Sequence, residues 1–159
     1  MENNLVVIGL GNTLRRDDGI GIHLLRALRR KKIKGVDYLD FSTSSLDLVN
    51  RIDRYDAAIL IDAIDAGLEA GKVKIFDLKD VACGLKEKAY SSHEMGLRYL
   101  SVLLNTLDIK TKIYVAGIQA EDTSYGDSVS EALNDNIPEM INEISKFVDA
   151  TKRSMEVIV

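Results

Sequence analysis

Apolar residues gather along the chain in two patterns: short continuous runs, and longer stretches in which they recur every three or four positions. The short runs are rich in β-branched residues, which is typical of buried strands. Such runs cover residues 5–10 and 57–63, and less regular segments that we also predict as strands cover residues 36–41, 72–77 and 112–117. The periodic stretches predict helices over residues 19–32, 45–52 and 93–107, with a helical tail after residue 129.

The order of strands and helices predicts a three-layer α/β domain with a five-stranded, twisted and mostly parallel sheet. We expect the fourth strand to run antiparallel, because residues 64–71 are too few for a parallel crossover, which needs a dozen or more. The segment 78–90 is expected to be irregular. In the tail, Pro138 is expected in the first turn of a helix that follows a short helix over residues 129–133.

Length and composition place the whole chain, residues 1–159, in a single domain. Hydrophobic residues make up 46% of the chain without a composition break, so it can bury a substantial core. No apolar run approaches the roughly 20 residues that span a bilayer, and no signal-peptide pattern opens the chain. The single cysteine, Cys83, excludes an internal disulfide and fits a reducing compartment. These features predict a cytoplasmic protein without membrane insertion.

The charge balance argues against nucleic acid as a partner. Twenty-five acidic residues against 21 basic ones give a formal net charge of -4, the wrong sign for general binding to phosphates. One basic cluster stands at the end of the first predicted helix, where cations complement the helix dipole. It consists of Arg26, Arg29, Arg30, Lys31, Lys32 and Lys34. We expect this cluster to be a solvated helix face.

The stretch between residues 9 and 21 is the most informative part of the sequence. Gly9 and Gly11 permit a tight turn after the first strand, but Leu14 occupies the sixth position of the dinucleotide-binding fingerprint, which requires glycine. Two adjacent acids, Asp17 and Asp18, then stand at the predicted helix N-terminus. One of them is expected to be an ordinary helix cap. A cap needs a single side chain, so the other carboxylate is available for a ligand or a metal ion.

Three polar residues that are distant in the sequence are predicted to meet at one edge of the sheet. Asp18 follows the first strand, Asp62 lies near the end of the third, and His93 begins the helix before the fifth. In open α/β sheets ligands bind outside the carboxyl ends of the parallel strands. The polar loop 119–127 is expected to border the same region. Two carboxylates and an imidazole suit a divalent ion such as nickel or zinc, or a metal-free site in which His93 acts as a base toward water.

Each of these residues also has a structural interpretation. His93 taken singly is more often a helix-start residue bonded to the backbone, and Asp62 can cap a turn together with Asp65. Because His93 and Asp62 are both expected at the same edge of the sheet as Asp18, a functional role is favoured over the structural one. His23 lies inside the first helix and is interpreted as a packing or surface residue. Cys83 has no histidine nearby in the sequence, which argues against thiol chemistry.

Four motifs follow one another along nearly the whole chain: GLGNTLRRDDGIG, ILIDAIDAG, SSHEMGL and VAGIQAEDTSYGDSVSEAL. Together they resemble the hydrogenase maturation proteases, the endopeptidases that trim the large subunits of nickel-iron hydrogenases. The resemblance implies an α/β fold with a twisted mixed sheet and a peptidase of aspartic or metal-assisted type. It also implies that Asp18, Asp62 and His93 contact the metal.

The resemblance further implies that nickel arrives with the substrate, the precursor of the large subunit. The enzyme then removes a C-terminal extension near the metal-binding cysteines, and zinc or another divalent ion can substitute for nickel. Gly11, Asn12 and Asp17 fall on the family's loop frame. Two positions depart from relatives: Ala120 replaces a proline, which predicts a less rigid loop, and Asp18 stands where some relatives carry glutamate.

Two other classes of function remain open. Peptidyl-tRNA hydrolases also begin with a VVGLGN-like strand and turn, and His23 could stand for their histidine, but Thr13 replaces their proline and the chain is acidic. The second class is a binding module for a nucleotide or for nickel. Leu14 argues against the nucleotide. A nickel carrier would use the same ligands as the peptidase, so only proteolysis separates the two.

Overall fold

The computed structural model describes residues 4–42, 45–82, 90–91 and 96–157. The five main strands are β1 (Leu5–Leu10), β2 (Val36–Phe41), β3 (Ala57–Asp65), β4 (Val73–Asp77) and β6 (Lys112–Gln119). They lie side by side in the order β2-β1-β3-β6-β4. The first three and β6 pair in parallel, whereas β4 runs antiparallel to β6. The predicted mostly parallel sheet with a reversed fourth strand is confirmed.

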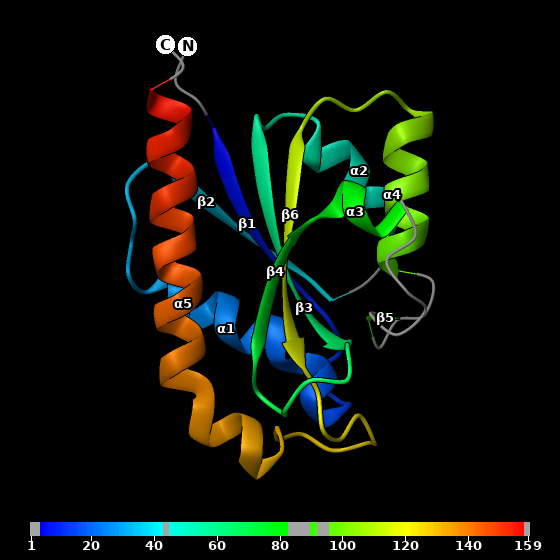
Figure 1. Ribbon diagram of the computed structural model, residues 1–159, viewed down its shortest axis with the longest axis vertical. Coiled ribbons are helices and arrows are strands. Elements are labelled where there is room, and N and C mark those ends of the chain that lie inside the picture. Colours follow the sequence, from blue (N-terminus) through cyan, green and yellow to red (C-terminus); the bar gives the residue numbers. More distant parts are fainter. Residues whose placement is uncertain (1–3, 43–44, 83–89, 92–95, 158–159) are drawn as a thin grey trace.

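Helices cover both faces of the sheet (Figure 1). One face carries α1 (Ile20–Arg29) and α5 (Glu131–Glu156); the other carries α2 (Ser45–Ile52), α3 (Leu78–Ala82) and α4 (Gly96–Thr106). The central strand β3 contributes to the cores on both faces. Ile59 and Ile61 belong to the core under α1 and α5, whereas Ala58 and Leu60 belong to the core under α2 and α4. A strand covered on both sides is apolar at nearly every position, which explains the run AAILI.

The segment that was expected to be irregular, residues 78–90, contains two short elements. Helix α3 fills its beginning, and the two-residue strand β5 (Tyr90–Ser91) begins at its end. β5 pairs antiparallel with the end of β3, with Ser91 opposite Ile64. Elements of two and five residues are too short to show a repeating hydrophobic pattern, so the sequence does not reveal them.

The tail is one helix, α5, so the prediction of a short helix followed by a second helix starting at Pro138 is wrong. Pro138 lies inside α5, and the helix bends near its N-terminal end (Figure 1). Leu133 on one side of the proline and Met140 on the other are both buried in the same core. Burial of this continuous stripe favours one helix over two. Within the described ranges, no helix is both long and apolar enough to cross a membrane.

The basic cluster at the end of α1 is solvated, as predicted. All six of its residues are exposed. Arg26 forms an ion pair with Asp40 at 3.3 Å, and Lys31 donates a hydrogen bond to the hydroxyl of Ser145. Contacts of this exposed kind contribute little to stability.

Candidate functional site

The loop after β1 turns tightly at the carboxyl end of the strand, and glycines make the turn possible. Gly11 has a φ of 126°, and a Cβ atom there would lie 1.9 Å from the carbonyl oxygen of Asp18. A Cβ on Gly21 would lie 2.2 Å from the carbonyl oxygen of Ile61. These close approaches hold the short 3-10 helix η1 (Arg16–Gly19) and the start of α1 against the end of β3.

The structure brings Asp18 and Asp62 to the same edge of the sheet. Each is only 1% exposed. Asp18 lies in η1, and its Oδ2 atom accepts a hydrogen bond from the backbone N–H of Asn12 at 3.0 Å. Asp62 lies in β3 between Leu60 and Ile64 in the strand's alternation, and both of these belong to the core under α2 and α4. The carboxylate of Asp62 therefore belongs to the face of the sheet that α4 covers.

His93, the third predicted site residue, lies outside the described residues, as does Cys83. Strand β5 brings the chain to the end of β3 two residues before His93, and α4 begins at Gly96 three residues after it. Among the described residues, no group of three His, Cys, Asp or Glu side chains is placed to hold a metal ion. The two described members of the predicted trio are thus close to one strand end.

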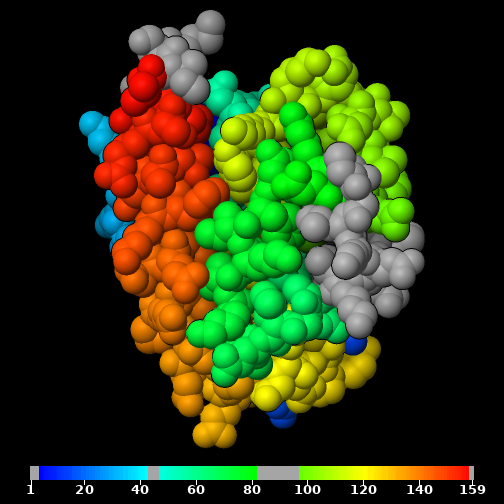
Figure 2. Space-filling view, viewed as in Figure 1, coloured from blue at the N-terminus to red at the C-terminus, as the bar shows by residue number. Residues whose placement is uncertain are grey.

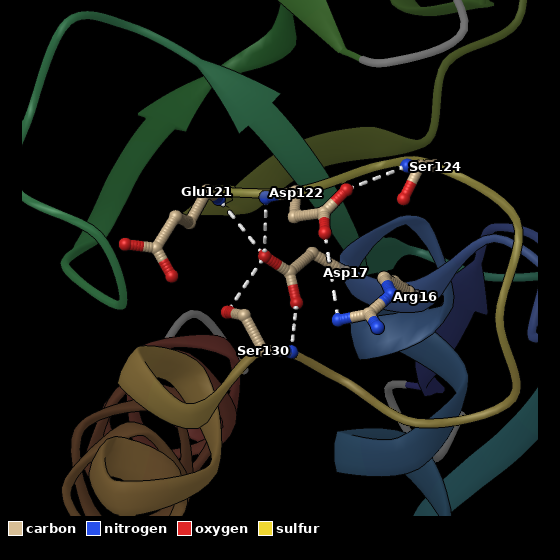
Figure 3. Close-up of polar contacts among 6 residues, drawn as sticks. All are labelled: Arg16, Asp17, Glu121, Asp122, Ser124 and Ser130. Atoms are coloured by element: carbon tan, nitrogen blue, oxygen red, sulfur yellow. Dashed lines mark hydrogen bonds and ion pairs between the residues drawn. The ribbon is translucent and has the colours of Figure 1, made fainter.

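Asp17 is completely buried and joins two loops that are distant in the sequence. Its Oδ2 atom accepts hydrogen bonds from the backbone N–H groups of Glu121 and Asp122, each at 2.9 Å, and from the Ser130 hydroxyl at 2.9 Å. Its Oδ1 atom accepts the backbone N–H of Ser130 at 2.6 Å (Figure 3). These donors lie 104 to 113 residues away, a separation that leaves no periodic signal in the sequence. Sequence reasoning therefore missed Ser130.

The prediction that one of the two acids caps the first helix is wrong. The residue before α1 is Gly19, and the residue before η1 is Arg15; neither helix start has a side-chain cap hydrogen bond. Because η1 leads directly into α1, Gly19 already has helical φ and ψ angles. The carboxylate of Asp17 instead accepts hydrogen bonds from backbone N–H groups of the loop after β6.

The same two loops are also joined along their backbones. The N–H of Arg16 donates to the carbonyl of Gly126, and the N–H of Gly126 donates to the carbonyl of Leu14. Arg16 and Asp122 form an ion pair at 3.4 Å (Figure 3). Hydrogen bonds from Ser124 and, to a smaller degree, the charge of Arg16 lower the pKa of the Asp122 carboxyl. Asp122 therefore stays ionised opposite Arg16 at neutral pH.

Gln119 fastens the loop after β3 to the same edge. Its Oε1 atom accepts hydrogen bonds from the N–H groups of Ala66 and Leu68, at 2.8 and 3.1 Å. The next residue, Ala120, donates its own N–H to the carbonyl of Ile64 at 3.0 Å. A proline at this position has no N–H to donate. The loop is therefore fastened at Ala120 by a hydrogen bond that a proline could not form.

His23 lies inside α1 and is half-buried, in keeping with a packing or surface role. Burial and the nearby charge of Arg26 lower its pKa. The side chain is thus neutral at physiological pH.

The family model for hydrogenase maturation proteases (HycI) matches residues 22–147. The chain belongs to this family. A relative named hydrogenase expression/formation protein HupD, from Thiocapsa roseopersicina, is 30% identical over 151 residues, which cover 92% of this chain and 68% of the relative. The hydrogenase 2 maturation protease of Escherichia coli is 31% identical over 121 residues, covering 74% and 73% of the two chains. Of a second HupD protein, from Bradyrhizobium diazoefficiens, the chain spans 52%.

Solved structures of the family share the fold. The hydrogenase maturation protease HybD from Thermococcus kodakarensis superimposes with a TM-score of 0.73 at 25% identity, covering 91% of this chain and 98% of that protein. The endopeptidase HybD from Escherichia coli gives a TM-score of 0.77 at 21% identity, covering 93% of both chains. Family membership places the chain among peptidases that act in hydrogenase maturation, and gives no support to the peptidyl-tRNA hydrolase or nucleotide-binding alternatives.

Proposed function

We propose that the protein is an endopeptidase that removes the C-terminal extension from the nickel-loaded precursor of a nickel-iron hydrogenase large subunit. Membership of the hydrogenase maturation protease family supports the reaction class. The observation that carries the site is the burial of Asp18 and Asp62 at one edge of the sheet. We assign metal contact and catalysis to these two residues and to His93. The single cysteine supports a cytoplasmic location.

The donor set fits a divalent ion. Aspartate is rarely buried completely, and a bound cation would stabilise two carboxylates that are buried at the same end of the sheet. Carboxylate oxygens together with an imidazole nitrogen bind nickel, zinc and related ions, and three protein ligands leave positions open for groups of the substrate. In this proposal the nickel belongs to the substrate, and zinc or another divalent ion can replace it. The bound ion would supply a Lewis acid next to the scissile peptide.

The protein's own groups orient the site. The backbone N–H of Asn12 fixes the Asp18 carboxylate, and β3 fixes Asp62 because it is hydrogen-bonded to β1 on one side and to β6 on the other. A carboxylate or imidazole at this edge can accept a proton from the attacking water molecule. This arrangement allows hydrolysis either with assistance from the metal or by carboxylate chemistry.

Mass spectrometry of a large-subunit precursor incubated with the protein tests this function. We expect the nickel-loaded precursor to become shorter and to release a C-terminal peptide, while the nickel-free precursor stays intact. His93→Ala is expected to abolish the cleavage. An uncut nickel-loaded precursor would reject the peptidase, and transfer of nickel without shortening would identify a carrier instead. Equal cleavage of both precursors would reject recognition of nickel.

A further inference from the structure

Three large apolar side chains are exposed around the candidate site. Leu14 is 66% exposed, Leu68 41% and Tyr125 85%. Leu14 follows β1, Leu68 follows β3 and Tyr125 follows β6, so each belongs to a loop at the carboxyl end of a parallel strand. We call these three the rim residues. Exposed apolar side chains that gather at one place on a protein mark interaction sites more often than scattered ones.

Leu14 and Tyr125 are held next to each other by contacts between their loops. The carbonyl of Leu14 accepts a hydrogen bond from the N–H of Gly126, the residue after Tyr125. The guanidinium carbon of Arg15 lies 5.7 Å from the centroid of the Tyr125 ring. Arg15 is itself fixed, because its Nε atom donates to the carbonyl of Thr123 at 3.1 Å. The backbone that carries the exposed side chains of Leu14 and Tyr125 is therefore held in place by hydrogen bonds between the two loops.

Leu68 stands on a third fastened loop. Its N–H donates to the side chain of Gln119, which is only 5% exposed, and the N–H of Gly71 donates to the carbonyl of Gln119. Figure 2 shows the loop after β3, in blue-green, against the loop after β6, in yellow, at the lower end of the molecule. Fixed backbone lowers the ordering cost when a partner binds.

The rim is continuous with the candidate site. Asp17 holds the loop after β6 through its side chain, and the adjacent residue, Asp18, belongs to the site itself. The charged pair between the two loops, Arg16 and Asp122, is already matched internally by its 3.4 Å contact. The three rim residues therefore offer a partner apolar contact beside a charged pair that is already matched.

We propose that the rim residues dock the folded body of the hydrogenase large-subunit precursor beside the segment that is cut. This inference rests on the proposed function. A precursor that presents a bound nickel ion to Asp18 and Asp62 brings its own surface toward the loops at the same end of the sheet, which carry the rim residues. The partner surface is apolar where it meets Leu14, Leu68 and Tyr125.

Steady-state cleavage of the nickel-loaded precursor by the double variant Leu14→Ser/Tyr125→Ser tests the docking surface. The matched control is Val102→Ser/Leu107→Ser, whose side chains are 55% and 53% exposed in and just after α4. We expect the rim variant to raise KM at least about tenfold, with kcat within about twofold of wild type. The control should change neither constant. An unchanged KM in the rim variant, or an equal rise in the control, overturns the inference.

Binding separates this inference from the proposed function. On the Asp62→Asn background, which is expected not to cleave, the precursor should bind to the protein at least about tenfold more weakly when the rim is changed. If wild type cuts no precursor, the proposed function fails. If wild type cuts the precursor and the rim variant binds it equally well, only the docking surface fails. A change in the oligomeric state of the rim variant, measured by sedimentation without precursor, would instead assign the rim to contact between copies of this chain.

Discussion

The two ends of the sheet are both fastened by hydrogen bonds, yet they bury different groups. At the amino end, the hydroxyl of Thr111 bridges the carbonyls of Ile52 and Tyr55 at 3.0 and 2.8 Å. At the carboxyl end the buried groups are carboxylates, and within the described residues buried carboxylates occur only there, at Asp17, Asp18 and Asp62. The example of Thr111 shows that a hydroxyl group is sufficient to hold neighbouring segments together by hydrogen bonding. Burying a carboxylate costs more free energy than burying a hydroxyl, so fastening alone does not explain why three carboxylates are buried at this end.

The adjacent residues Asp17 and Asp18 show this difference within one turn of chain. Asp17 accepts four hydrogen bonds from the loop after β6 and the start of α5, which offsets the cost of its burial. Asp18 faces its own loop and lies next to β3, the strand that carries Asp62. These contacts give Asp17 a structural role, whereas the role of Asp18 in the site stays a proposal.

Replacing Asp17 should have the largest effect on stability. Asp17→Ala leaves the N–H groups of Glu121, Asp122 and Ser130 without their acceptor, so we expect the free energy of unfolding to fall by about 3 kcal/mol or more. Urea unfolding followed by circular dichroism measures this loss. Asp17→Asn keeps one acceptor oxygen and should lose less. If Asp17→Ala cost under about 1 kcal/mol, Asp17 would not be the fastening residue of this end.

Replacing Thr111 should have a smaller effect, confined to stability. Thr111→Val preserves the shape of the side chain and removes the hydroxyl hydrogen that the two carbonyls share, so we expect a loss of about 1 kcal/mol in the free energy of unfolding. Cleavage of the precursor should continue at the wild-type rate. A loss of cleavage in this variant without unfolding would break the distinction between the two ends of the sheet.

The smallest expected effect is a pH dependence at His23. Its pKa is lowered from 6.5 by burial and by Arg26, so below about pH 6.5 the unfolded chain binds more protons than the folded one. Neutral His23 therefore makes its full contribution to the free energy of unfolding above about pH 6.5, and this contribution is lost as the pH falls. The side chain is partly exposed, so the change is a few tenths of a kcal/mol. Unfolding of wild type and His23→Gln at about pH 7.5 and about pH 5.5 measures it. If the free energy of unfolding of the wild type rose relative to that of His23→Gln between about pH 7.5 and about pH 5.5, the predicted direction of the effect would be wrong.

Most of the fold could be predicted from the sequence because its elements are long enough to show a period. The eight-residue connection 64–71 also predicted the reversal of β4 correctly. Shorter elements such as β5 could not be predicted, and Pro138 was misread because burial of residues on both sides of it outweighs its local preference.

The candidate site was predicted as far as strand ends determine it. Asp18 and Asp62 follow from the rule that parallel strands end at one edge, and both lie there. The residues alone could not separate the roles of Asp17 and Asp18, since the two are identical neighbours and only the path of η1 decides which carboxylate meets the loop 121–130. The family resemblance did separate them, because it implied metal contact for Asp18 and a place in the loop frame for Asp17. The roles of Asp18, Asp62 and His93 in metal contact and catalysis all stay predictions, and His93 lies outside the described part of the chain.

The proposed role of Asp18 and Asp62 in cleavage can be tested by the rate at which Asp18→Asn and Asp62→Asn cleave the nickel-loaded precursor. Both substitutions preserve size while removing a negative charge from the carboxyl end of the sheet. We expect that neither variant shortens the precursor, and that each unfolds at a urea concentration no lower than that at which the wild type unfolds. Cleavage at the wild-type rate by both variants would contradict the assignment of the site.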